Sequence, residues 1–201
     1  MMVAMGGSMA ICNAEITVLD YESTGSLRNF QNEPWQIGMV SLRNGKVDPG
    51  TMYESLLRID INRPFNPHAP GRHDLLREEM AEAPTLRGLW PRIKTRLTEY
   101  PLAAHNVATE RKFTVGSAPM HRFGPWIDTL KVARKAWPGQ PSYALEDLVA
   151  ALDLKQRIIT LCPDREAHDA LYDAVAAAVL LEHLFAQPGW GNVTVGELAA
   201  I

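Results

Sequence analysis

The sequence feature that most constrains the fold is the dipeptide Asn44-Gly45, which follows one apolar segment and precedes another. Asparagine and glycine tolerate positive φ, so this pair favours a two-residue hairpin turn. Segment 36–42, QIGMVSL, comes before the turn, and a further strand is expected near residues 52–57. Segment 15–20, EITVLD, has the pattern of a buried strand. The first 57 residues therefore predict an antiparallel meander of three strands.

After a Pro/Gly-rich loop at 62–73, helical periodicity alternates with short apolar segments. The predicted helices cover 74–80, 85–97 with a bend at Pro91, a segment from 107, a segment after Asp128 through Lys135, 145–152 capped by Ser142, and 169–186; the predicted strands cover 101–106 and 125–129. This order predicts an α/β fold with a mixed sheet and helices on both faces.

Composition narrows the class of protein. A chain of 201 residues with 46% apolar and 21% charged residues predicts one globular domain at 14–187, with a flexible leader at 1–13 and a short tail at 188–201. The chain has no run of 18 apolar residues, so no membrane span is predicted. Only two cysteines occur, which favours a reducing, cytoplasmic location. The net charge of -3 argues against binding long nucleic acid by charge alone, so such contacts should be local or mediated by cations.

Two acids lie at the end of the first predicted strand. Asp20 and Glu22 are two residues apart, and the period of a strand places them on the same face. Like charges this close repel unless a cation lies between them. The pair therefore indicates either a metal site or an ordinary acidic strand end that turns at Thr24-Gly25.

The last predicted helix carries an acid on its apolar side. Asp173 falls within a stripe of small and aliphatic residues, where an unpaired charge would be costly. A functional carboxylate and a buried salt bridge both explain it. His168 can face the same site only from the loop before the helix, which Asp169 would cap.

A third acid, Glu110, lies in the segment LAAHNVATERKF. It could be a solvated acid of a first helical turn, favoured by the helix dipole. If Asn106 caps the helix, Glu110 instead shares the inward side with Val107 and Phe113. Together the separate carboxylates predict an oxygen-rich site for hard divalent cations.

Three motifs resemble the DEDDh 3′-5′ exonuclease superfamily, the DnaQ-like proofreading exonucleases. They are Asp20-Tyr21-Glu22-Ser23-Thr24-Gly25, then His105-Asn106 leading to an acid, and then His168-Asp169-Ala170-Leu171-Tyr172-Asp173. The resemblance covers about residues 15 to 186. It implies an RNase H-like fold with a five-stranded mixed sheet and helices on both faces.

The resemblance also implies roles for residues. Asp20, Glu22, Glu110 and Asp173 would hold two Mg²⁺ or Mn²⁺ ions, and His168 would be the general base that releases nucleoside 5′-monophosphates from a single-stranded 3′ end. Candidate substrate-binding residues are Thr24 and Gly25 beside the terminal nucleotide, His105 and Asn106 as supports, and Arg165 on a phosphate.

The chain departs from the family pattern at Glu110, where the family has aspartate, and at Thr109, where an aromatic residue is common. Glutamate keeps the charge and adds a methylene. This departure leaves a catalytically silent nucleic-acid- or polymerase-binding module as an alternative. An RNA-specific enzyme of the oligoribonuclease or ribonuclease T kind is another. A DNA polymerase partner and a homodimer are the two assemblies considered.

Overall fold

The predicted meander is present as three long antiparallel strands in the computed structural model, which describes residues 8–201. The strands are β1 (Glu15–Ser23), β2 (Pro34–Arg43) and β3 (Lys46–Leu56). Asn44 and Gly45 join β2 to β3 with φ angles of 53° and 73°. Both angles lie in the left-handed region that a two-residue hairpin turn requires, so the hairpin signal is confirmed.

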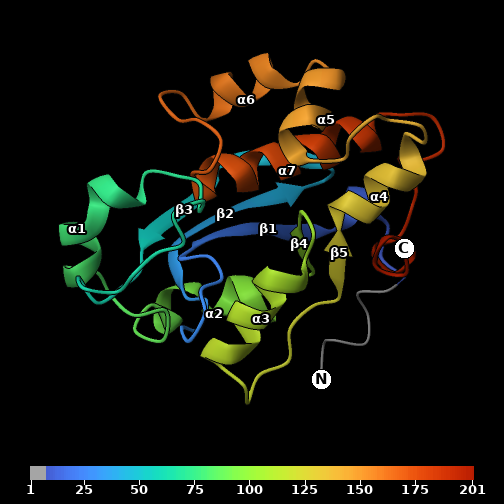
Figure 1. The fold of residues 1–201 in the computed structure, drawn as a ribbon. Coiled ribbons are helices and arrows are strands. Elements are labelled where there is room, and N and C mark those ends of the chain that lie inside the picture. The colour runs from blue at the N-terminus through green and yellow to red at the C-terminus, as the bar shows by residue number, and fades with distance from the viewer. Residues whose placement is uncertain (1–7) are drawn as a thin grey trace.

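Two short parallel strands complete the sheet. β4 (Leu102–Ala104) pairs with β1, and β5 (Trp126–Asp128) pairs with β4. The strand order is β3-β2-β1-β4-β5, which makes β1 the central strand (Figure 1). The predicted mixed sheet of five strands is therefore confirmed, and Asp20 and Glu22 lie on its central strand.

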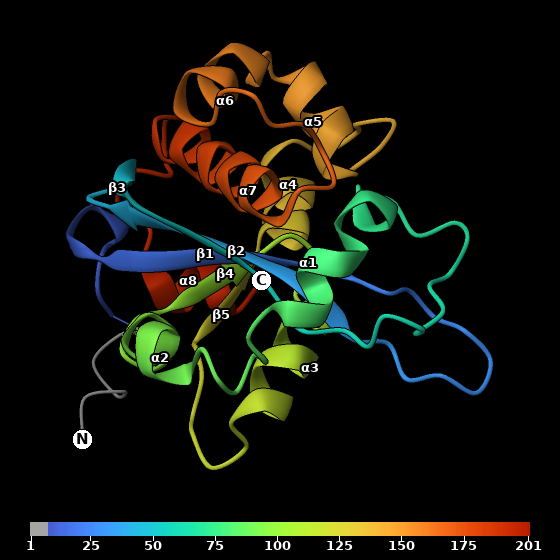
Figure 2. The same cartoon turned by 90° about the vertical axis from the view of Figure 1, so that its left-hand side faces the viewer.

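Helices cover both faces of this sheet (Figure 2). The helices of the described residues are α1 (Arg77–Glu82), α2 (Trp90–Thr98), α3 (Ala108–Ser117), α4 (Thr129–Ala136), α5 (Leu145–Ala151), α6 (Lys155–Leu161), α7 (Ala170–Phe185) and α8 (Val195–Ala199), with short 3₁₀ helices at Ile11–Asn13 and His73–Leu76. α7 lies across one face beneath α5 and α6, whereas α2 and α3 cover the opposite face. No described helix has both the length and the apolar character needed to cross a membrane.

Side-chain alternation along β1 decides which helices its acids meet. Ile16 and Val18 belong to the core under α7, whereas Leu19 and Tyr21 belong to the core that α2 and α3 cover. By this period of two, the positions of Asp20 and Glu22 continue the α7 face of the strand.

A glycine lets α7 approach the sheet closely. A Cβ atom at Gly38 of β2 would lie 2.2 Å from the carbonyl carbon and oxygen of Ala170, a separation that real Cβ atoms do not reach. Gly38 is also the cross-strand partner of Asp20. The first residue of α7 is thus seated directly on the sheet beside one of the acids.

Several details of the predicted secondary structure are wrong. Pro91 does not bend a helix over 85–97; it lies in the first turn of α2, where a missing N–H costs nothing. The N-cap of α5 is Ala144 and not Ser142. The Ser142 hydroxyl accepts a hydrogen bond from the Ala144 N–H. The helices α6 and α8 were not predicted from the sequence.

Described residues on either side of the predicted domain pack against it. Residues 1–7 of the predicted leader lie outside the described residues, but Ile11 is buried in the core. In the tail, Thr194 and Glu197 form a capping box at α8, and Ala10 pairs with Thr194 in an isolated bridge. The predicted boundaries of the domain, before residue 14 and after residue 187, stay a prediction.

Candidate active site

The site begins where β1 ends. Glu22 is 7% exposed, and its cross-strand partner is Gln36. Asp20, two residues earlier, is opposite Gly38. The strand therefore delivers both carboxylates to the place where α7 starts.

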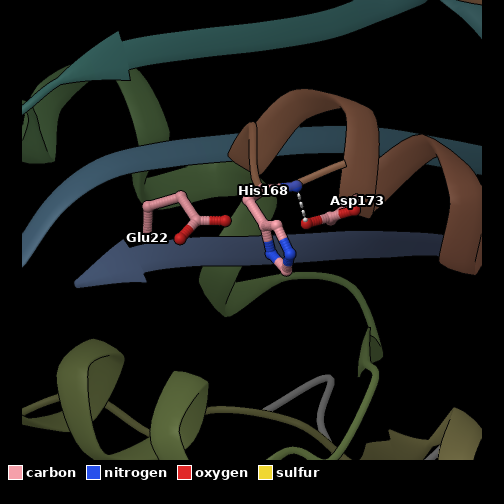
Figure 3. Close-up of side chains that lie close together, drawn as sticks. All are labelled: Glu22, His168 and Asp173. Atoms are coloured by element: carbon pink, nitrogen blue, oxygen red, sulfur yellow. Dashed lines mark hydrogen bonds between the residues drawn. The ribbon is translucent and has the colours of Figure 1, made fainter. Parts of the chain in front are cut away.

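The N-terminus of α7 brings His168 and Asp173 to the same place. Asp169 is the N-cap, and its carboxylate accepts the N–H groups of Leu171 and Tyr172, as the sequence predicts. His168 precedes the cap with a φ of 66°, a conformation that non-glycine residues seldom adopt and that recurs at functional sites. Its N–H donates to Asp173 Oδ2 at 3.0 Å, which ties the loop to the first turn (Figure 3).

Three side chains converge there. Glu22, His168 and Asp173 each offer a ligand atom, and these atoms lie within 4.8 Å of one another. In Figure 3, Glu22 rises from β1 toward the loop and first turn that carry the other two. The imidazole Nε2 of His168 also lies 3.1 Å from Glu146 Oε1 on α5. Asp20 and Glu110 are outside this closest grouping of three.

Glu110 approaches from α3, on the other face of the sheet. It is 5% exposed and shares the inward side of its helix with Phe113, which confirms the predicted burial. The predicted cap is wrong, because the N-cap of α3 is Val107 and no side chain caps the helix. Glu110 Oε2 is buried without a hydrogen-bond partner.

The pKa values of the four acids are all raised above their ordinary values. Burial, and then the charge of Asp173, raise the pKa of Glu22 from 4.5 to about 8. Burial raises the pKa of Glu110 from 4.5 to about 7 and that of Asp173 from 3.8 to about 6. The pKa of Asp20 is also raised, first by burial and then by Asp173, Glu22 and Glu110. Burial is the main cause at all four carboxylates, and at Asp20 and Glu22 the neighbouring acids add to it.

This donor set fits hard divalent cations. Carboxylate oxygens are the ligands that Mg²⁺ and Mn²⁺ prefer, and a cation among them would remove the mutual repulsion. The partnerless Oε2 of Glu110 is a buried acceptor that such an ion could satisfy. The structure thus contains an acidic group able to bind divalent metal.

Thr24 and Gly25 form the turn after β1. Thr24 is fully buried; its hydroxyl accepts the N–H of Glu33 at 3.1 Å, and its carbonyl accepts the N–H of Asn66. Gly25 has a φ of 72°, and a Cβ there would lie 2.7 Å from that of Asn66. The turn is rigidly tied to the loop at 62–73. Contact of Thr24 or Gly25 with a nucleotide stays a prediction.

His105 and Asn106 lie between β4 and α3. The ring of His105 uses both nitrogens, with Nδ1 2.9 Å from the Thr129 hydroxyl and Nε2 2.9 Å from the Tyr143 carbonyl. Burial lowers its pKa, so a neutral ring that donates from Nε2 fits these partners. Asn106 has a φ of 66°, and its N–H donates to Asp128. These contacts support the predicted bracing role of the pair.

Four further residues shape the site and were not singled out as site residues from the sequence. They are Gln36, Gly38, Glu146 and Asp169. Asp169 alone had a sequence signal, as a helix cap. Gln36, Gly38 and Glu146 act across separations that no local pattern encodes. The predicted phosphate contact, Arg165, has its guanidinium paired with Asp169 and Glu54.

Comparison with known proteins identifies the family of the chain. The family model RNase_T, described as Exonuclease, matches residues 17–181. The chain belongs to this exonuclease family. Exodeoxyribonuclease 10 of Escherichia coli strain K12 is 28% identical over 176 residues, which cover 87% of this chain and 70% of that protein. The 3′-5′ exonuclease DinG of Staphylococcus haemolyticus strain JCSC1435 is 29% identical over 172 residues, but this chain spans only 18% of its length.

Solved structures agree with the family. Exonuclease X in complex with 5′ overhanging duplex DNA superposes with a TM-score of 0.66 at 25% identity, covering 92% of this chain and 99% of that one. Escherichia coli exonuclease I in complex with a dT13 oligonucleotide gives a TM-score of 0.63 at 18% identity, covering 87% of this chain and 41% of that one, and supports the fold. The protein is a DnaQ-like 3′-5′ exonuclease with an RNase H-like fold, as the motifs predicted.

Proposed function

We propose that this exonuclease shortens single-stranded DNA from the 3′ end, with two divalent cations and with His168 as the general base. The observation that carries the proposal is the meeting of ligand atoms of Glu22, His168 and Asp173 within 4.8 Å. Asp20 and the buried Glu110 lie beside them, and their pKa values are raised. A carboxylate group next to an imidazole is the set that metal-assisted hydrolysis of a phosphodiester needs.

Asp20, Glu22, Glu110 and Asp173 would hold the cations. Bound Mg²⁺ or Mn²⁺ would lower the pKa of a water molecule and neutralise the charge that develops on the scissile phosphate. The carboxylates would then stay ionised, because a cation among them favours the charged form that burial and neighbouring acids disfavour.

His168 is suited to take the proton of the attacking water. Its side chain is 47% exposed, so the ring is open to solvent and substrate. Glu146 lies at Nε2 and would stabilise the imidazolium that forms. The water oxygen bonds to phosphorus as the bond from phosphorus to the 3′-oxygen breaks. That oxygen takes a proton from solvent, which leaves a nucleoside 5′-monophosphate and a strand shorter by one residue.

The choice of DNA rests on the relatives. One is named an exodeoxyribonuclease, and two matched structures contain DNA with an overhang or a single strand. Cysteines 12 and 162 are both free, which supports a reducing, cytoplasmic location. A DNA polymerase partner and a homodimer stay predictions that a mass measurement in solution, with and without polymerase, tests.

The test is digestion of 5′-labelled single-stranded DNA and RNA of one sequence, with Mg²⁺, Mn²⁺ or a chelator. We expect a ladder that shortens from the 3′ end of DNA, release of mononucleotides, and no digestion with chelator. The Asp173→Asn variant and an oligonucleotide with a blocked 3′ end are the matched controls. Faster digestion of RNA would reassign the substrate, and failure with both metals would leave a silent binding module.

A further inference from the structure

Arg165 lies at the centre of an ion-pair network just before α7. Its Nη1 donates to both carboxylate oxygens of Asp169 at 2.9 Å, and its Nη2 donates to Glu54 Oε1 on β3 at 2.5 Å. The Arg165 side chain is 28% exposed, less than Glu54 at 40%. A partly buried guanidinium that bridges two carboxylates holds them in a fixed geometry, as a flexible surface pair does not.

Asp169 passes this constraint to the helix. Besides the two N–H groups that it caps, its Oδ2 accepts a hydrogen bond from Gln36 Nε2 at 3.0 Å. Gln36 Oε1 in turn accepts the N–H of Ala170 at 3.2 Å. One side chain of β2 therefore holds both the cap and the first residue of α7.

The site residues lie on either side of this connection. Gln36 is the cross-strand partner of Glu22, so the residue that anchors α7 is also paired with the strand that carries the acid. His168 directly precedes Asp169, and the Asp173 N–H donates to the Asp169 carbonyl at 2.9 Å. A displacement of Asp169 would therefore move His168 and Asp173 relative to Glu22.

We propose that Glu54, Arg165 and Asp169, together with Gln36, form a positioning clamp at the start of α7. The clamp sets the spacing between Glu22 on β1, His168 in the preceding loop and Asp173 in the first turn. This inference rests on the proposed function and assigns Arg165 to positioning in place of the phosphate contact predicted from the sequence.

The surroundings of Arg165 favour the clamp. The cavity beside it, of about 510 Å³, has four acids, two arginines and His168 among its lining residues. The acids are Glu54, Asp164, Glu166 and Asp169, and the arginines are Arg72 and Arg165. A cavity with this excess of carboxylates repels a phosphate, and the guanidinium that would have to attract it is already paired.

Glu54→Gln separates the two roles of Arg165, because they predict opposite effects. If Arg165 contacts phosphate, loss of the Glu54 charge removes one of its two competing carboxylates, and KM falls with kcat kept. If Arg165 is part of the clamp, the outer anchor is lost and the α7 terminus loosens. The clamp predicts a kcat about 10-fold lower with KM changed less than about 2-fold, since small misplacements of catalytic groups act mainly on turnover.

The experiment compares Glu54→Gln, Glu54→Asp and Arg43→Ala in the full chain. Arg43 is the matched control, since it too bridges two carboxylates, Glu15 and Asp48, at the far end of the sheet. We expect Glu54→Asp to keep more of kcat than Glu54→Gln because the charge remains, and Arg43→Ala to keep the wild-type kcat. A lower KM or an unchanged kcat in Glu54→Gln overturns the clamp.

Amide hydrogen exchange without metal or substrate gives a second readout. The N–H groups of Leu171 and Tyr172, which Asp169 caps, should exchange at least about 10-fold faster in Glu54→Gln than in wild type or Arg43→Ala. Unchanged exchange at these amides overturns the clamp even if activity falls. An inactive wild type would instead overturn the proposed function, and the exchange result would still decide the clamp.

Discussion

Two helices supply side chains to the acidic site, and they are fixed in different ways. α7 begins at a side-chain cap, is hydrogen-bonded to Gln36 of β2 and rests on Gly38. α3 begins at Val107 with no side-chain cap, on the opposite face of the sheet. Its contact with β1 includes the edge-on packing of Phe113 against Tyr21, with ring centroids 5.6 Å apart.

The difference shows where the site can tolerate change. At the start of α7, the His168 N–H is bonded to Asp173, and the Ala170 N–H is bonded to Gln36 of the sheet. On α3, Glu110 is positioned by burial, with one carboxylate oxygen partnerless. The departure from the family's aspartate thus occurs on the less constrained helix, where an extra methylene meets fewer fixed partners.

His168→Ala tests the anchored side with the largest expected effect. Loss of the general base should lower kcat about 100- to 10,000-fold. The metal-binding carboxylates remain, so Mg²⁺ should still raise the melting temperature of the variant. Activity on a labelled oligonucleotide and thermal melting with and without Mg²⁺ measure the two effects. Turnover near the wild-type rate would show that another group takes the proton.

Gly38→Ala tests whether the seat of α7 matters. The added Cβ would overlap the Ala170 backbone at 2.2 Å, so the helix terminus must shift. Such overpacking costs about 1–3 kcal/mol of unfolding free energy, and activity should fall with it. Gly116→Ala on α3, where a Cβ meets nothing within 4 Å, is the matched control and should be nearly neutral. Equal stability of the two variants would remove the argument from close approach.

The sequence predicted the anchored side of the site better than the other. The carboxylates of β1 and Asp173 could be found because strand and helix periods place an acid where an apolar residue is expected. The cap at Asp169 was found because N-caps have a local signature. The start of α3 was misjudged because Asn106 adopts a left-handed conformation, with its N–H bonded to Asp128, and does not serve as the helix cap.

Other contacts could not have been predicted from local patterns at all. Gln36 and Asp169 are separated by 133 positions, and Glu54 and Arg165 by 111. Neither pair has a spacing that a helix or a turn imposes. The strand order brings the two members of each pair together, and this order exists only in the folded chain.

A pair of exchanges compares the two helices directly. Glu110→Asp returns the family residue to α3 and should keep most activity, because the helix can adjust. Asp173→Glu adds a methylene on the fixed α7 and should lower activity at least about 10-fold more than Glu110→Asp does.

Glu110→Gln should weaken metal binding and activity at least about 10-fold, as loss of a group in a metal site does. Metal titration and initial rates measure these effects, and equal losses on both helices would refute the distinction.

The smallest expected effect is a pH dependence of stability in the metal-free protein. The pKa values of Glu22, Glu110 and Asp173 are raised on folding to about 8, 7 and 6, chiefly by burial. The folded state therefore holds protons that the unfolded state has already released. This contribution to stability is complete below the ordinary pKa values and is lost as the pH rises through 6 to 8.

With chelator, we expect the melting temperature to fall by about 4–8 °C between pH 5.5 and pH 8.5, which corresponds to about 2 kcal/mol in a chain of this size. Saturating Mg²⁺ should offset most of the fall, because the cation replaces the missing protons. Glu22→Gln removes the group with the highest of the three pKa values. It should therefore flatten the dependence of melting temperature on pH more than Glu110→Gln does. Differential scanning calorimetry measures all of this. A melting temperature that rises with pH in chelator would mean that the carboxylates lie near cationic partners and not near one another.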